Sequence, residues 1–144
     1  MTLTLGTDRF VLDGSVALAW LFDDEKSPYA DAILTRLPAI EMLVPRLWHL
    51  EVANVLLTSE RRKRCSQADT STWLAFLADL PIVIDPATEI RAWTDTLAIA
   101  RQHGLTAYDA AYLELAIRES VPLATLDAKL EAAAKALGVQ SFQP

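Results

Sequence analysis

The sequence of 144 residues contains little cysteine, little glycine and no long apolar run. Its one cysteine, Cys65, has no partner for an internal disulfide and stands outside any Cys and His cluster, which fits a reducing compartment. With only 4 Gly and 7 Pro, the chain shows no low-complexity tract or linker. No segment approaches the roughly 18 uninterrupted apolar residues of a membrane span, and the N-terminus lacks a signal pattern. We therefore expect a cytoplasmic protein without a membrane segment.

Positive charge is also scarce. The chain has 13 Lys and Arg against 19 Asp and Glu, for a formal net charge of −6. This balance argues against a broad electrostatic surface for nucleic acid, because phosphate binding normally relies on clustered cations. The objection is incomplete, since a divalent cation bound by clustered carboxylates would reverse the local sign of the charge.

Apolar residues are plentiful, at 52% of the chain against 22% charged residues. This composition is typical of a well-packed globule and not of a disordered chain. The length is ordinary for one domain, which at this size buries roughly two thirds of its unfolded surface. We expect a single domain over residues 1–144.

Short apolar runs alternate with helical patterns along the chain. The runs predict strands at residues 9–12, 42–45, 82–84 and 121–125, with a short edge strand at 139–142. Capping and periodicity signals predict helices that follow N-caps at Ser15, Ser27 and Thr106, and others over 47–63, 66–80, 88–102 and 128–137. Strands that alternate with helices imply an α/β fold with a parallel sheet covered on both faces.

Acidic residues follow or adjoin these elements in a suggestive way. Asp13 and Asp127 each lie just past the carboxyl end of a predicted strand, and Asp109 lies in the first turn of a predicted helix. In parallel sheets the carboxyl ends of the strands meet at one edge, where ligands gather. Carboxylates brought together there would raise one another's pKa unless cations held them.

Each of these acids also has a purely structural interpretation. Asp13, followed by Gly14, can shape a turn through its own side chain. Asp109, three residues after Thr106, can complete a capping box, and Asp127 can be an N-cap. The residue pattern alone leaves both interpretations open.

A fourth acid, Glu51, lies on a helix that is apolar over most of its circumference. At about 100° per residue, Glu51, Asn54, Thr58 and Arg61 form one narrow polar stripe. The stripe can face water, or it can line a cleft because the rest of the helix must be packed.

Other conspicuous side chains have structural alternatives too. The only dense basic run, Arg61-Arg62-Lys63-Arg64, can offset the dipole of the helix that it ends, or it can contact RNA phosphates or an acidic partner segment. Both histidines, His49 and His103, are expected to be structural. Amphipathic patterns place the tryptophans in the core or an interface instead of on base-stacking platforms, namely Trp20, Trp48, Trp73 and Trp93.

Four segments in order, VLDGSVALAWLF, HLEVANVL, LTAYDAAYLELA and LATLDAKL, resemble the successive motifs of PIN-domain ribonucleases, most closely the VapC toxins of bacterial VapBC toxin–antitoxin systems. The resemblance spans nearly the whole chain. Matched motif by motif, the acids of the family's active site correspond to Asp13, Glu51, Asp109 and Asp127.

Neighbouring positions match as well. Ser15 and Thr125 match small hydroxyl positions beside the first and last acids, and Asn54 matches a polar position one turn beyond the second acid. Gly14 stands where the family often has Ala, a departure that removes no functional atom.

The resemblance implies a three-layer α/β/α sandwich with a central parallel sheet, and an endoribonuclease that uses Mg²⁺ or Mn²⁺. Asp13 and Asp109 would hold the principal ion, with Glu51 and Asp127 completing the site directly or through water, since hard oxygen ligands suit these ions. The implied partners are an RNA substrate, often a tRNA or a ribosomal RNA loop, a cognate antitoxin protein and a second copy in a homodimer. Arg61 to Arg64 are the candidate RNA contacts.

Two other functions remain compatible with the sequence. One is a non-catalytic PIN-like module that binds a protein and uses the acids as caps. The other is a metal phosphatase, although one phosphatase class requires an Asp two residues after Asp13, where this chain has Ser15.

Overall fold

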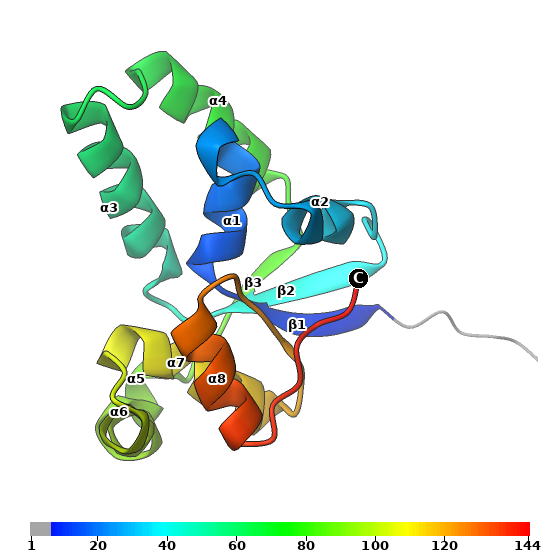
Figure 1. Cartoon of the computed structure of the whole chain (residues 1–144), viewed down its shortest axis with the longest axis vertical. Helices are drawn as coiled ribbons and strands as arrows, with labels where there is room; N and C mark the ends of the chain where they lie inside the picture. Colours follow the sequence, from blue (N-terminus) through cyan, green and yellow to red (C-terminus); the bar gives the residue numbers. More distant parts are fainter. Residues whose placement is uncertain (1–6) are drawn as a thin grey trace, which may run out of the picture.

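The computed structural model describes residues 7–144. Its parallel sheet has the strand order β3-β2-β1-β4, with bounds β1 (Asp8–Leu12), β2 (Ile40–Val44), β3 (Ile82–Ile84) and β4 (Leu123–Ala124). The chain adds β2 and β3 on one side of β1 and then β4 on the other, so the strand order reverses next to β1 (Figure 1). Such a switch point leaves a crevice at the carboxyl ends of the strands.

Helices cover both faces of this sheet. Figure 1 shows α1 to α4 over one face and α5 to α8 over the other, which confirms the three-layer α/β/α architecture. Within residues 7–144, no helix is both long and apolar enough to span a bilayer. The bounds are α1 (Gly14–Leu21), the 3₁₀ turn η1 (Asp23–Glu25), α2 (Pro28–Leu34), α3 (Trp48–Arg61), α4 (Gln67–Ala78), α5 (Thr88–Arg91), the π-helical turn η2 (Ala92–Thr96), α6 (Leu97–His103), α7 (Ala107–Glu119) and α8 (Ala128–Ala136).

The centre of the sheet and the helix α7 carry the core. In β1, Phe10, Val11 and Leu12 are fully buried, as expected of a parallel strand with helices on both sides. In α7, every residue from Ala110 to Ala116 is buried. The first turn of α7, which contains Asp109, is therefore anchored by a helix packed almost all round.

The C-terminal segment extends the sheet beyond β4. The Leu123 N–H donates to the Gln140 carbonyl at 2.9 Å, and the Phe142 N–H donates to the Leu123 carbonyl at 3.0 Å. The ring of Phe142 stacks on Phe10, with centroids 3.9 Å apart. The edge strand predicted over 139–142 is thus reduced to a single bridge at Ser141.

Several predicted helix ends are correct. The hydroxyls of Ser27, Ser66 and Thr106 each accept a hydrogen bond from the backbone N–H three residues ahead, as N-caps do. Gly104 ends α6 in the left-handed conformation, with φ of 62°.

Other boundaries differ from the predictions. Asp13, not Ser15, occupies the N-cap position of α1, because the backbone at Asp13 is still extended and helical geometry begins at Gly14. The single helix predicted over 88–102 contains the π-helical turn η2. A π-helical turn adds one residue to the helical repeat, and the spacing of apolar residues over so short a segment does not reveal it. β4 is shorter than the predicted 121–125, since Pro122 has no N–H to donate to the ladder.

The tryptophans divide into two groups. Trp48 is buried, Trp20 donates its Nε1–H to the Ala30 carbonyl at 2.7 Å, and Trp73 packs edge-on against Phe22. Trp93, in η2, is 90% exposed, so a core position is wrong for this residue. Its exposure leaves the interface alternative and the base-stacking alternative open.

A buried ion cluster joins α7 to the turn after β3. The carboxylates of Asp85 and Glu114 are both buried, and the Arg118 guanidinium donates two hydrogen bonds to each, at 2.5 to 3.1 Å. Burial alone would raise the pKa of Asp85, but hydrogen bonds, first from Arg118, hold that pKa below its usual range. Arg118 therefore hydrogen-bonds both buried carboxylates, and its single positive charge offsets part of the cost of burying them.

We predict that Arg118→Ala lowers the free energy of unfolding by about 3 kcal/mol, because it leaves two buried carboxylates unpaired. Since the pKa of Asp85 is lowered on folding, the stabilisation should be complete above pH ~4 and be lost as the pH falls through the folded pKa. Urea unfolding at several pH values measures both effects. Arg91→Ala, which breaks the exposed Arg91–Asp95 pair, is the control and should cost less than about 1 kcal/mol; equal losses in the two variants would contradict the prediction.

Candidate active site

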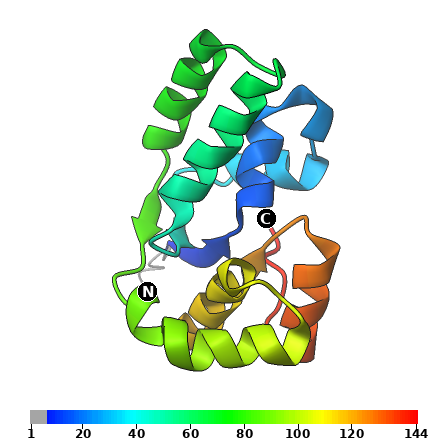
Figure 2. The ribbon, with the colours of Figure 1, turned by 90° about the vertical axis from the view of Figure 1, so that its left-hand side faces the viewer.

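A pocket of about 230 Å³ opens at the carboxyl edge of the sheet and is lined by the four predicted acids, Asp13, Glu51, Asp109 and Asp127. The acids come from both helical layers: Asp13 and Glu51 from α1 and α3 on one side, Asp109 and Asp127 from α7 and α8 on the other. Figure 2 looks toward this edge, where α1, α3 and α7 converge. The remaining lining is small or apolar, apart from Ser15 and Tyr112.

Asp13 is the most buried of the four, with 7% of its surface exposed. Although it occupies the N-cap position of α1, its side chain makes no capping hydrogen bond, so the turn or cap interpretation does not account for it. Instead its Oδ2 accepts hydrogen bonds from Ser15 Oγ at 2.6 Å and from Thr125 Oγ1 at 2.8 Å. The second oxygen, Oδ1, accepts no hydrogen bond from residues 7–144.

Ser15 and Thr125 also tie the start of α1 to the loop after β4. The Leu126 N–H donates to Ser15 Oγ at 2.9 Å, and the Asp127 N–H donates to Thr125 Oγ1 at 3.0 Å. Each hydroxyl thus donates to Asp13 and accepts from the β4–α8 loop. This network fixes Asp13 relative to the loop that leads to Asp127.

Asp109 lies in the first turn of α7, where the Thr106 hydroxyl caps its backbone N–H at 3.0 Å. Its carboxylate is only half-buried, yet its pKa is raised, first by burial and then by the charges of Asp13 and Asp127. Lys129 and the Thr106 hydroxyl offset this effect only in part. Asp109 is therefore a carboxylate whose charge the protein itself does not balance.

Glu51 projects from the first turn of α3 toward α7. The Tyr112 hydroxyl donates to Glu51 Oε1 at 2.7 Å. Burial raises the pKa of Glu51, the Tyr112 hydrogen bond opposes that rise, and the charges of Asp13 and Asp109 add to it. Of the two interpretations of the polar stripe, the structure favours the cleft for Glu51.

Asp127 has both of the roles considered from the sequence. Its Oδ1 accepts the backbone N–H groups of Lys129 and Leu130 at 2.9 and 3.0 Å, so it is the N-cap of α8. It also lines the pocket, and its Oδ2 accepts no hydrogen bond from residues 7–144. Capping and pocket lining use different oxygens of the same carboxylate.

The pocket brings the four acids to one place without making a finished metal site. Within residues 7–144, no three acidic, His or Cys side chains stand close enough together to hold an ion. The arrangement is a set of facing carboxylates with unused oxygens, not a closed coordination shell.

Other predicted residues lie outside the pocket. Asn54, one turn beyond Glu51 on α3, is exposed and does not line it. The basic run lies at the opposite end of α3 (Figure 1), and Arg64 is already paired with Asp24 at 2.9 Å and stacked over the ring of Phe22. Neither His49 nor His103 lines the pocket.

Sequence reasoning missed one polar residue of the site, Tyr112. Its position three residues after Asp109 places it on the same side of α7, which is a signal that the helical period provides. Its partner, Glu51, is 61 positions away, so no local pattern indicates the contact.

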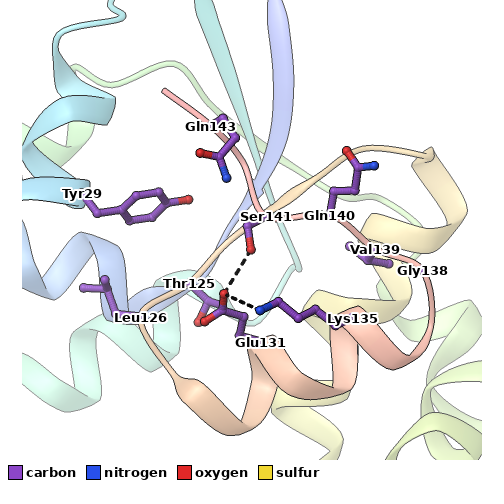
Figure 3. Close-up of a pocket in the computed structure, with 10 residues that line it drawn as sticks. All are labelled: Tyr29, Thr125, Leu126, Glu131, Lys135, Gly138, Val139, Gln140, Ser141 and Gln143. Atoms are coloured by element: carbon purple, nitrogen blue, oxygen red, sulfur yellow. Dashed lines mark hydrogen bonds and ion pairs between the residues drawn. The ribbon is translucent and has the colours of Figure 1, made fainter.

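A larger pocket lies elsewhere, between α2, α8 and the C-terminal segment, with a volume of about 830 Å³ (Figure 3). Its one carboxylate, Glu131, accepts a hydrogen bond from Ser141 at 3.3 Å and pairs with Lys135. Because its charge is locally balanced, this pocket has none of the electrostatic character of the acidic one. Thr125 links the two pockets, because it lines the larger one and donates a hydrogen bond to Asp13 in the acidic one.

The fold and the pocket define a class: parallel α/β proteins with clustered acids at the carboxyl edge of the sheet. The family model of the PIN domain matches residues 10–136. Ribonuclease VapC3 of Pyrobaculum aerophilum is 31% identical over 122 residues, which are 85% of this chain and 92% of that protein. The crystal structure of PAE2754 from Pyrobaculum aerophilum has a TM-score of 0.67 at 25% identity, covering 96% of this chain and 88% of that one. The chain therefore belongs to the PIN-domain family, as a ribonuclease of the VapC type.

We predict that Thr125→Val, which keeps the shape of the side chain, lowers the free energy of unfolding by about 1–3 kcal/mol. The variant removes a hydrogen bond to the charged Asp13 and leaves the Asp127 N–H without its acceptor. Thermal and urea unfolding measure the loss. Thr72→Val, whose hydroxyl bonds only to its own helix, is the control and should change stability by less than about 0.5 kcal/mol; a Thr125 variant as stable as this control would contradict the network.

Proposed function

We propose that the protein is a divalent-metal-dependent endoribonuclease and the toxin of a toxin–antitoxin pair. The observation that carries this proposal is the pocket in which four carboxylates from two helical layers face one another. Among residues 7–144, no Lys or Arg lines that pocket, so the negative charge there is not neutralised by the protein. Family membership supports the same function.

The donor set suits a hard divalent cation. Asp13, Asp109, Glu51 and Asp127 offer carboxylate oxygens, which Mg²⁺ and Mn²⁺ prefer over nitrogen or sulfur. Side-chain rotations would be needed to gather three of them around one ion. When bound, such a cation offsets the charge on the phosphoryl oxygens of RNA and activates a water for attack.

The chain's own residues have distinct tasks in this proposal. Asp13 is held by Ser15 and Thr125 with one oxygen left free for the ion, and Asp109 stands ready with its charge unbalanced. Asp127 presents its free oxygen from the start of α8. Asn54 remains a supporting residue only by motif, since it lies outside the pocket.

The substrate is an RNA, for which we propose a tRNA or a ribosomal RNA loop by resemblance. Arg61, Arg62 and Lys63 are exposed and remain candidate contacts to its backbone. Arg64 is less available, because Asp24 and Glu25 pair with it.

The proposed protein partner is an antitoxin. An apolar groove of about 570 Å³ between α3 and α4, lined by residues such as Leu56, Leu74 and Leu77, supports this proposal. Trp48 and Val52 line both the groove and the acidic pocket. A segment of the partner lying in the groove would therefore reach the edge of the active site.

The nuclease proposal predicts that Asp13→Asn and Asp109→Asn each reduce RNA cleavage at least about 100-fold while the fold is kept, as judged by circular dichroism. Cleavage should stop in EDTA and return with Mg²⁺ or Mn²⁺, because the acids act through the ion. The control is Asp23→Asn, which neutralises an exposed acid in η1 outside the pocket.

Equal cleavage in EDTA and in Mg²⁺ would overturn the metal-dependent mechanism. A different result would support the non-catalytic binding module. In that case the wild-type chain cleaves no RNA, and the Asn variants bind a protein partner as well as the wild-type chain does.

For the proposed homodimer we predict an interface that includes Ile90 and Trp93, which are 74% and 90% exposed and three positions apart. Such exposed apolar side chains are commonly buried by a partner. The double variant Ile90→Ser with Trp93→Ser should shift the protein to monomer in analytical ultracentrifugation. Ser substitution at Leu50, an exposed apolar residue of α3, tests whether the effect is local; a double variant that stays dimeric would place the interface elsewhere.

A further inference from the structure

Tyr112 connects the two helical layers at the active site. It lies on α7, one turn after Asp109, and only 2% of its surface is exposed. Its hydroxyl reaches Glu51 Oε1 on α3 at 2.7 Å. Among residues 7–144, this is the one hydrogen bond between a side chain of α3 and a side chain of α7.

The hydrogen bond decides where a flexible acid points. A glutamate side chain has several rotatable bonds, and the like charges of Asp13 and Asp109 would drive Glu51 away from the pocket. The Tyr112 ring is rigid and packed, so its hydroxyl is a fixed donor. The Tyr112 hydroxyl therefore keeps Glu51 inside the pocket against the repulsion of Asp13 and Asp109, because the packed ring cannot shift as Glu51 itself could.

The bond also leaves the acid half free. Oε1 of Glu51 is occupied by Tyr112, while Oε2 accepts no hydrogen bond from residues 7–144. Asp13 is arranged in the same way, with Oδ2 held by Ser15 and Thr125 and Oδ1 free. In both acids a hydroxyl donor fixes one oxygen and thereby aims the other.

Tyr112 can act only as a donor here. An ionised carboxylate has only acceptor oxygens, so the phenol hydroxyl is the donor of the 2.7 Å hydrogen bond to Glu51. A donor to a carboxylate makes a charge-assisted bond, which is stronger than a bond between neutral groups.

We propose that Tyr112 is a positioning residue that holds Glu51 in place for the divalent cation. The inference rests on the proposed metal-dependent function and assigns to α7 a second task beside carrying Asp109. Without the hydroxyl, Glu51 would lose its orientation and the pocket would lose a preordered ligand.

The test measures Mn²⁺ binding to the purified full chain in the absence of RNA. Electron paramagnetic resonance or calorimetry gives the affinity. Tyr112→Phe removes one oxygen and should weaken Mn²⁺ binding about 10- to 100-fold, the usual effect of losing a group that orients a ligand. In a background of Glu51→Gln, the same substitution should add little further loss, because the charged carboxylate that Tyr112 orients has been replaced by a neutral amide, which is a weaker ligand for Mn²⁺.

Two matched controls separate positioning from packing. Tyr29→Phe also removes a part-buried hydroxyl with a 2.7 Å hydrogen bond, to the Phe142 carbonyl, and should leave Mn²⁺ affinity unchanged. Tyr108→Phe removes an exposed hydroxyl from the same helix and should do the same. Tyr112→His, whose ring keeps a donor, is measured beside Tyr112→Phe and should bind Mn²⁺ more tightly than that variant; if Tyr112→Phe is too unstable to measure, Tyr112→His is compared with the wild-type chain and should bind Mn²⁺ more weakly, and equal affinity would contradict the inference.

The outcomes are distinguishable. A wild-type chain that binds no Mn²⁺ overturns the proposed function, and the inference with it. A wild-type chain that binds Mn²⁺ while Tyr112→Phe binds it equally well overturns the inference alone. A loss that is equally large in the Glu51→Gln background would show that Tyr112 acts on something other than Glu51, which also overturns it.

Discussion

Repulsion between carboxylates is the constraint around which this protein is built. The parallel sheet and its switch point bring four acids to one edge, where burial and mutual charge raise the pKa of Glu51 and of Asp109. The buried strands and α7 hold these acids together against their repulsion. The hydroxyls around these acids also hold them in place, since Ser15, Thr125 and Tyr112 each donate a hydrogen bond to a carboxylate oxygen. Under the proposed function, this uncompensated negative charge is what a divalent cation would offset.

Much of the fold was predictable because the relevant signals are local. Strands β1, β2 and β3 are short apolar runs between breaking residues, and the caps Ser27 and Thr106 act within three residues of themselves. The errors arose where tertiary structure overrides the local pattern. Serine is a residue type that commonly caps helices, but the backbone at Asp13 is extended and helical geometry begins at Gly14. The Ser15 hydroxyl therefore donates to the Asp13 carboxylate instead of capping the helix. The π-helical turn and the exposure of Trp93 are equally invisible in the period of the apolar residues.

The site was predictable in part, and chiefly through family motifs. Spacing alone left each acid with a structural explanation, and for Asp127 that explanation is correct, since it caps α8 as well as lining the pocket. Contacts between distant positions, such as Tyr112 with Glu51, follow from the way the two layers meet and not from any neighbouring residue. The distances between the carboxylates depend on how the two helical layers pack against the sheet, which the sequence does not specify. In this packing the four acids share a pocket without forming a closed coordination shell.

The C-terminal segment supports the strand that leads to the acidic pocket. β4 has only two residues, and its outer side is paired by the backbone of Gln140 and Phe142, whose ring is wedged against β1. The next residue after β4 is Thr125, which holds Asp13. Loss of the residues from Ser141 onward would therefore leave the outer side of β4 without its backbone partners and would loosen the strand that leads into this threonine, while every acidic residue stayed in place.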